Sequence, residues 1–121
     1  MDVKKQLGTA IENYGATLGI KKKNVAHAAI AEIELPEEAN ASRTVRDALI
    51  EVGEILEEDL DSGLYIATVK AGAANANPAL VVAIAEAHGA KLGACAKEGL
   101  IKQSTAKKAI EKVRKASFRR N

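Results

Sequence analysis

The sequence predicts an α/β (α+β) fold, a two-layer sandwich in which about three helices pack on a four-stranded mixed or antiparallel sheet. Three observations predict this class. Apolar residues recur at helical spacing in residues 2–18, 44–60 and 104–117, residues 25–35 and 64–70 show the pattern of strands, and residues 78–97 form a long apolar run. The expected order is helix, strand, helix, three strands and helix (αβαβββα), within one domain of residues 1–121.

The composition limits the chemistry that the chain can carry. Of its 121 residues 47% are hydrophobic but only 2% are aromatic, so the core has to be built from Ala, Val, Ile and Leu. The single cysteine excludes an internal disulfide and a cysteine-based metal cluster. The sequence shows neither a secretory signal nor a run of about 18 uncharged apolar residues. We therefore expect a cytoplasmic protein without membrane contact.

Charge is divided unevenly along the chain. Residues 30–61 hold eleven acidic residues against Arg43 and Arg46, whereas residues 97–121 hold nine basic residues against Glu98 and Glu111. This asymmetry indicates either a partner of one sign or two halves that face each other, within the fold or across a subunit boundary.

The first two elements are expected to be a helix and a strand. Residues 2–18 carry an amphipathic stripe, and Gly19 is placed to end the helix. Residues 25–35 alternate, and Pro36 ends that strand. The alternation places His27 on the buried face. Because no second ligand-type residue stands at ligand spacing, we expect His27 to be a hydrogen-bonded core histidine rather than a catalytic one.

The best-defined helix is expected over residues 44–60. Thr44 and Asp47 fit a capping box with Asp in place of Glu, and the apolar stripe is Val45, Leu49, Val52, Leu56 and Leu60. Negative charges then fall at the negative end of the helix dipole, namely Glu57, Glu58, Asp59 and Asp61. A basic surface of this chain or of a neighbour can compensate them, and so can a divalent cation. Since the spacing matches no metal-binding loop, we assign no metal ligand.

Residues 78–88 are compatible with two structures. In the one that we favour, they form a hairpin with the following residues and turn at His88 and Gly89. Its register pairs Ala87 with Ala90, Glu86 with Lys91 and Val82 with Cys95. In the other structure, Asn77 caps a helix that begins at Pro78 and stops at Gly89.

The favoured hairpin is apolar on both faces. Leu80, Val82 and Ile84 share one face, while the other carries Val81, Ala83, Ala85, Leu92, Ala94 and Ala96. Three helices do not readily cover both faces of such a hairpin. We therefore expect a second copy of the chain to cover part of it, in a homo-oligomer.

Two loops have the composition of an anion site. Residues 71–78 contain Gly72, which can turn N–H groups toward an anion, and the polar amides Asn75 and Asn77. Further on, a helix N-terminus bears two hydroxyls with two lysines nearby: Lys97, Lys102, Ser104 and Thr105. A plain turn and a plain N-cap explain the same residues. If both loops lie at one edge of the sheet, they would form a single ligand site.

The last helix, which begins at Gln103 or Ser104, carries basic residues on its outer face. Lys107, Lys108, Lys112, Arg114 and Lys115 could follow a phosphate backbone, which would make the chain a nucleic-acid-binding module. The sequence lacks RRM, KH and helix-turn-helix signatures, and it has few aromatic residues for stacking. A solvated face that neutralises the acidic helix explains the same charges.

Cys95 is the remaining candidate. Its neighbours Ala94 and Ala96 indicate a buried, unreactive thiol, whereas a reactive one would require exposure and a cation such as Lys97. A thiol-dependent enzyme or soft-ligand carrier is therefore a third hypothesis.

The sequence thus favours a non-catalytic, homo-oligomeric protein that binds a small phosphate- or carboxylate-bearing metabolite and acts as a regulator or carrier. It assigns no catalytic residue and names no cofactor. A nucleic-acid module and a thiol-dependent protein are the alternatives, and the identity of the ligand and the subunit number are left open.

Overall fold

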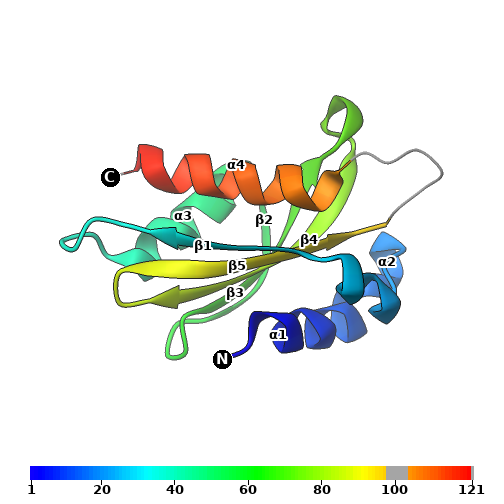
Figure 1. The fold of residues 1–121 in the computed structure, drawn as a ribbon, viewed down its shortest axis with the longest axis horizontal. Coiled ribbons are helices and arrows are strands. Elements are labelled where there is room, and N and C mark those ends of the chain that lie inside the picture. Colours follow the sequence, from blue (N-terminus) through cyan, green and yellow to red (C-terminus); the bar gives the residue numbers. More distant parts are fainter. Residues whose placement is uncertain (98–103, 121) are drawn as a thin grey trace.

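A five-stranded antiparallel sheet organises the fold (Figure 1). The computed structural model describes residues 1–97 and 104–120. The strands lie in the order β1-β5-β4-β3-β2, with the bounds Ala29–Glu34 (β1), Gly53–Asp59 (β2), Leu64–Ala71 (β3), Asn77–Glu86 (β4) and Gly89–Ala96 (β5). The class is α+β, as predicted, but the sheet has five strands where the sequence predicted four.

Helices cover both faces of this sheet. α3 (Ala41–Val52) and α4 (Thr105–Arg119) pack on one face, and α1 (Val3–Ala10) packs on the other (Figure 1). The two-layer prediction is therefore wrong about the N-terminal helix, which forms a layer of its own. Within residues 1–97 and 104–120, no helix is both long enough and apolar enough to cross a membrane.

The first helix matches the sequence prediction. α1 passes through a π-helical turn, Ile11–Gly15, into the short α2, Ala16–Leu18. Gly19 ends the run with a φ of 69°, a left-handed conformation that glycine adopts without strain. The predicted stripe faces the sheet, because Val3, Leu7 and Ile11 are buried in one cluster with β4 and β5.

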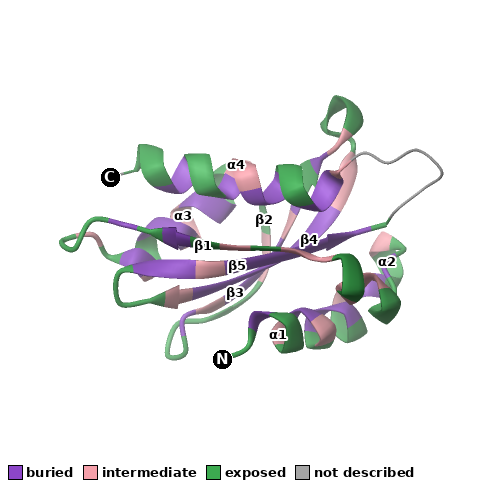
Figure 2. Cartoon of the chain, in the orientation of Figure 1, coloured by how far each residue is buried: buried purple, intermediate pink, exposed green. Residues whose placement is uncertain are grey.

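Both faces of the central hairpin are buried within one chain (Figure 2). On the α1 side the sheet contributes Ile66, Leu80, Val82, Ile84 and Cys95. On the side of α3 and α4 it contributes, among others, Tyr65, Val69, Val81, Ala83, Leu92 and Ala94. The argument that another copy must cover the hairpin therefore fails, because α1 covers its second face. A homo-oligomer remains a prediction, without that argument to support it.

Residues 78–88 are extended, so the hairpin is confirmed and the helical alternative is wrong. The register differs from the predicted one, since Glu86 pairs with Gly89, Val82 with Gly93 and Leu80 with Cys95. The turn is thus made by Ala87 and His88. Each predicted partner is displaced by two residues, which preserves the face of every side chain. Glu86 and Lys91 still form an ion pair, at 3.6 Å, although they are not directly opposed.

Gly89 has a different role from the predicted one. Among the described glycines, a positive φ occurs at Gly19, Gly63 and Gly72, and not at Gly89. Instead, β1 approaches the start of β5 so closely that a Cβ atom at position 89 would lie 2.0 Å from the carbonyl oxygen of Ile33. The glycine is therefore required by strand packing rather than by the turn.

The second predicted helix is confirmed over residues 44–52 only, and its predicted cap is wrong because Thr44 lies inside the helix. α3 begins at Ala41, where the side chain of Asn40 accepts a hydrogen bond from the Arg43 backbone N–H (3.0 Å), and it ends at Val52. The next seven residues form β2 at the edge of the sheet. Gly53 has an extended backbone with a φ of −163°, and the strand contains a bulge at Leu56.

This correction also removes the predicted acidic helix end. The acidic residues lie on or just after an edge strand, where charges discourage pairing with another sheet. Two of them have partners in the same chain. Glu58 accepts a hydrogen bond from Arg46 (2.7 Å), and Glu57 accepts one from the Tyr14 hydroxyl (2.8 Å). The expected compensation of a helix dipole therefore does not apply, and of these acidic residues Glu58 has a cationic partner, Arg46, within the described chain.

The first strand is shorter than predicted. Residues Lys22–His27 form a 3-10 turn, which is closed by a hydrogen bond from the Lys21 backbone N–H to the Asn24 side chain (2.8 Å). β1 then begins at Ala29. His27 is exposed rather than buried, so the prediction of a core histidine is wrong.

We predict that Gly89→Ala lowers the free energy of unfolding by about 1–3 kcal/mol, because the added methyl group overlaps the Ile33 carbonyl and forces β1 away from β5. Gly8→Ala is the matched control. A Cβ atom at position 8 meets no heavy atom within 4 Å, so the helix gains about 0.5–1 kcal/mol. Urea unfolding followed by circular dichroism measures both. Equal stability of the two variants would contradict the strand contact.

Candidate functional site

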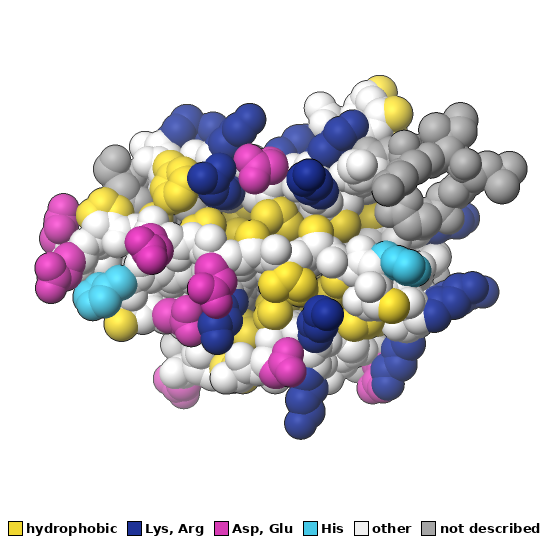
Figure 3. Space-filling view, viewed as in Figure 1, with side chains coloured by type: hydrophobic (Ala, Val, Ile, Leu, Met, Phe, Trp, Pro, Cys, Tyr) yellow, Lys and Arg dark blue, Asp and Glu magenta, His cyan; other side chains and the backbone are white. Residues whose placement is uncertain are grey.

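A hollow of about 530 Å³ lies along the outer face of α4. Its lining, which we call the α4 hollow, consists of Asn75, Ser104, Lys107, Lys108, Glu111, Lys112 and Lys115. The α4 residues recur at three- and four-residue spacing and therefore share one face of the helix. Figure 3 shows lysine and arginine side chains gathered over α4. Four lysines against one glutamate make this lining cationic.

The two predicted loops meet beside this hollow. The side-chain amide of Asn77 donates hydrogen bonds to the Thr105 hydroxyl (3.0 Å) and to the Lys97 carbonyl (3.3 Å). These bonds hold the start of β4 against the start of α4. Thr105 is buried, so its hydroxyl serves this contact. Asn77 and Thr105 thus position the site instead of facing a ligand.

Asn75 and Ser104 are the predicted residues that line the hollow. Asn75 ends a short 3-10 turn, Ala73–Asn75, that follows Gly72. Both Asn75 and Ser104 have a φ of 53°. In the described structure, the Ser104 hydroxyl makes no capping hydrogen bond to α4. A plain N-cap therefore does not account for Ser104.

The first turn of α4 adds backbone donors to this region. The first N–H groups of a helix have no partner within the helix, and the helix dipole places partial positive charge there. Ser104 directly precedes this turn, and its carbonyl accepts the first helical hydrogen bond, from the Lys108 N–H (3.0 Å). The polar residues of the loop and the positive end of the helix therefore occupy the same end of the hollow.

Of the two lysines predicted for this site, Lys97 does not line the hollow. The aliphatic chain of Lys97 lies beside Gly19, since a Cβ atom there would be 3.0 Å from its Cδ. Lys97 therefore extends toward the end of α2, on the other face of the sheet. Lys102 lies outside the described residues.

The residues predicted for nucleic-acid binding largely line the same hollow. Lys107, Lys108 and Lys115 are exposed there, while Lys112 also donates a hydrogen bond to the Lys70 carbonyl (2.8 Å). Arg114 is the exception. It pairs with Glu111 (3.5 Å), and its guanidinium lies 5.1 Å from the centre of the Phe118 ring. Sequence reasoning missed Glu111 as a lining residue, although its spacing from Lys107 and Lys108 places it on their face.

Cys95 lies in the core beneath the N-terminal helix. Its side chain is buried, and its thiol donates a long hydrogen bond to the Asn24 carbonyl (3.5 Å). Burial raises the pKa of the Cys95 thiol to about 11. These properties oppose a reactive thiol. Within residues 1–97 and 104–120, no three His, Cys, Asp or Glu side chains gather as they would around a metal ion.

We predict that iodoacetamide alkylates Cys95 at pH 8 about a hundredfold more slowly in the folded than in the unfolded protein, because folding raises the thiol pKa from 9.0 to about 11 and buries the sulfur. Mass spectrometry with and without urea measures the alkylation rate, and fast alkylation of the folded protein would contradict the burial.

The same pKa shift of the Cys95 thiol predicts that the stability of the fold depends on pH. The contribution of the thiol to the free energy of unfolding is complete below pH 9 and is lost as the pH rises through 11, since the unfolded thiol ionises first.

Comparison with known proteins adds no family to these observations. The chain matches no protein-family model, no curated protein and no solved structure. Any ligand therefore has to be inferred from the side chains of this chain, and of the residues predicted to bind a small anion, Asn75 and Ser104 line the α4 hollow.

Proposed function

We propose that this chain is a non-catalytic binding protein whose α4 hollow takes a small phosphate- or carboxylate-bearing metabolite, in the role of a regulator or carrier. The supporting observation is the hydrogen bond between Asn77 and Thr105. It brings the Asn75 turn to the first turn of α4, so that polar donors and four lysines line one hollow.

The lining offers several kinds of donor to an anion. The lysine ammonium groups supply charge, while the Asn75 amide and the Ser104 hydroxyl supply directed hydrogen bonds. The volume of about 530 Å³ lies within the range of small-molecule sites. Glu111 also lines the hollow and favours a ligand that presents a hydrogen-bond donor, such as a sugar hydroxyl, beside its anionic group.

Because the lysines of the α4 hollow are largely exposed, the affinity for an anion depends on how many of them contact it. Single exposed charges contribute little, because water and salt screen them. Affinity therefore requires several of these lysines to act together on one ligand with more than one negative charge. We expect pyrophosphate and citrate to bind more tightly than monovalent anions, and binding to weaken as salt is added.

We predict that pyrophosphate and citrate raise the melting temperature, and that Lys107→Glu with Lys108→Glu weakens their binding at least about tenfold. Lys4→Glu with Lys5→Glu is the matched control. It changes the net charge equally, and both pairs lie near the start of a helix on opposite faces of the sheet. Thermal shift and isothermal titration measure the effect. If neither probe stabilises the wild type, or if both double variants respond alike, the proposal is wrong.

A specific observation supports nucleic-acid binding as a second candidate. The lysines of the hollow extend from Lys107 to Lys115 on a helix of 15 residues, which spans about 22 Å and could contact several successive phosphates. On this hypothesis the ligand is a polymer, and the hollow holds one stretch of its backbone.

We predict for this candidate that a 20-nucleotide RNA binds at about 50 mM salt, and that its affinity falls steeply with added salt and with the Lys107→Glu and Lys108→Glu changes. Fluorescence anisotropy with RNA of increasing length distinguishes the two functions. Affinity that rises with length supports the polymer, whereas an affinity equal to that of pyrophosphate at every length favours the small ligand and excludes the nucleic-acid function.

A further inference from the structure

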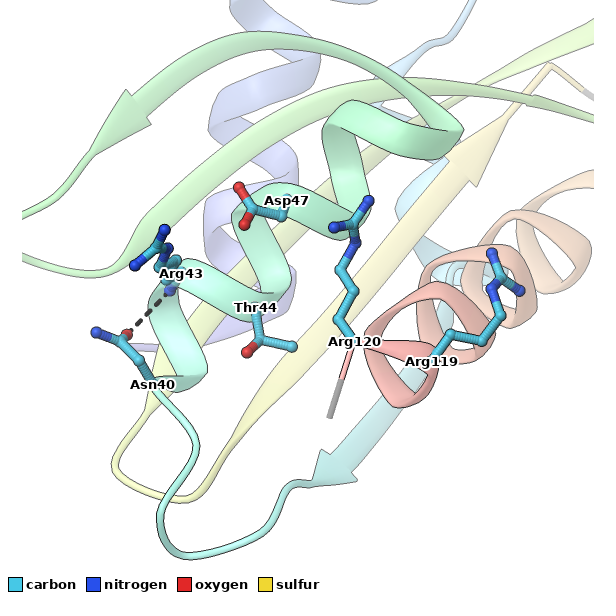
Figure 4. A pocket seen from close by; sticks show the side chains of 6 residues that line it. All are labelled: Asn40, Arg43, Thr44, Asp47, Arg119 and Arg120. Atoms are coloured by element: carbon cyan, nitrogen blue, oxygen red, sulfur yellow. Dashed lines mark hydrogen bonds between the residues drawn. The ribbon is translucent and has the colours of Figure 1, made fainter.

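A second polar groove lies between the first half of α3 and the C-terminal end of α4. It has a volume of about 490 Å³. Its lining, which we call the α3 groove, consists of the N-cap Asn40 with Arg43, Thr44 and Asp47 of α3, and of Arg119 at the end of α4 with the C-cap Arg120 (Figure 4). It shares no lining residue with the α4 hollow. The groove is therefore a separate place on the surface.

Arg43 is distinctive among the arginines of the chain. Arg46 binds Glu58, Arg114 pairs with Glu111, and both Arg119 and Arg120 bind Glu51. Arg43 has no such acidic partner among the described residues, although it stands at the rim of a groove. A guanidinium presents five N–H donors in a fixed plane, which suits the oxygens of a phosphate or a carboxylate.

Thr44 provides an independent indication of a ligand. Only 8% of this residue is exposed, and it lines the groove. Its hydroxyl makes no hydrogen bond within the described part of the chain, where every fully buried polar side-chain atom has a partner. The hydroxyl therefore borders the open space of the groove. Because this hydroxyl is reached from the groove, it can hydrogen-bond to a ligand that enters there in place of water.

The remaining lining residues complete a set of donors. The Asn40 side-chain oxygen caps Arg43 N–H, which leaves the amide group of Asn40 as a donor next to the positive end of α3. Arg120 extends from the end of α4 toward α3 (Figure 4). It bonds Glu51 through one terminal nitrogen (2.8 Å), and the other N–H groups of its guanidinium remain to face the groove.

Asp47 is the opposing charge in the lining. Its carboxylate lies 3.7 Å from Arg46, outside the groove, which offsets part of its repulsion toward an anion. Glu51 likewise balances the two arginines of α4. The cation left without a counterion is thus Arg43, beside Thr44 and Asn40.

We propose that the α3 groove is a second ligand site that binds a compact oxyanion, a phosphate monoester or a carboxylate, between Arg43, Thr44 and Arg120. Arg43 supplies the main charge, and the Thr44 hydroxyl donates the hydrogen bond that lacks a protein acceptor. Since this site uses neither the lysines nor the loops of the α4 hollow, it stands or falls independently of the function proposed above.

The test is a titration of inorganic phosphate and acetate into the ¹⁵N-labelled protein in the Lys107→Glu, Lys108→Glu background, where the α4 hollow is disabled. We expect saturable shifts of the backbone amides of residues 41–44 and of the Asn40 side-chain amide. Arg43→Gln should raise the dissociation constant at least about tenfold, whereas Arg114→Gln, which removes the same charge elsewhere, should leave it unchanged.

Each result decides the proposal. Shifts that saturate with phosphate but not with acetate, or the reverse, identify which oxyanion fits. Absence of saturable shifts up to about 50 mM of both probes, far weaker than ordinary metabolite binding, would overturn the site. So would shifts of the same size in the Arg43→Gln variant. A Thr44→Val variant, which keeps the shape of the side chain, should weaken binding without unfolding α3.

Discussion

Burial of the β4–β5 strand pair on both faces is the constraint on which the rest of the structure depends. Residues Leu80 to Ile84 are almost wholly hidden, so helices have to lie on each side of the sheet. Small residues make this possible: a Cβ atom at Gly93 would lie 2.9 Å from Val3, which shows how closely α1 approaches. With both faces occupied by apolar packing, no charged side chain is buried among the described residues.

The parts of the fold that the sequence predicts correctly follow from periodicity. Alternation gave both faces of the hairpin, because side-chain direction has a period of two and survives a register error of two residues. The register itself depended on the turn, and Gly89 resembles a turn residue although β1 is what requires it. In residues 44–60 the helical stripe runs into a strand. Leu56 fits the spacing of a helix and that of a strand. The boundary between the two elements is Gly53, where the backbone becomes extended.

Most of the lining of the α4 hollow was visible in the sequence, which missed only Glu111 among the lining residues. The composition of the two loops and the lysine spacing on α4 are local features, and the fold places them together. What the sequence could not show is the direction of long side chains: Lys97 lies against Gly19, and Lys112 binds the Lys70 carbonyl. The α3 groove is harder still to predict from the sequence, because Arg43 and Arg120 line one groove only through the packing of α3 on α4. The spacing of Arg43, Thr44 and Asp47 along α3, just after its cap Asn40, was the local signal.

The carboxylates on the two outer strands have a consequence for the whole molecule. β1 carries Glu32 and Glu34, and β2 carries Glu54, Glu57, Glu58 and Asp59, at opposite margins of the sheet. Two molecules that approach margin to margin therefore meet as like charges, which keeps their free backbone groups from joining into a continuous ribbon. The charges on these two strands therefore act against strand-by-strand association at either margin of the sheet.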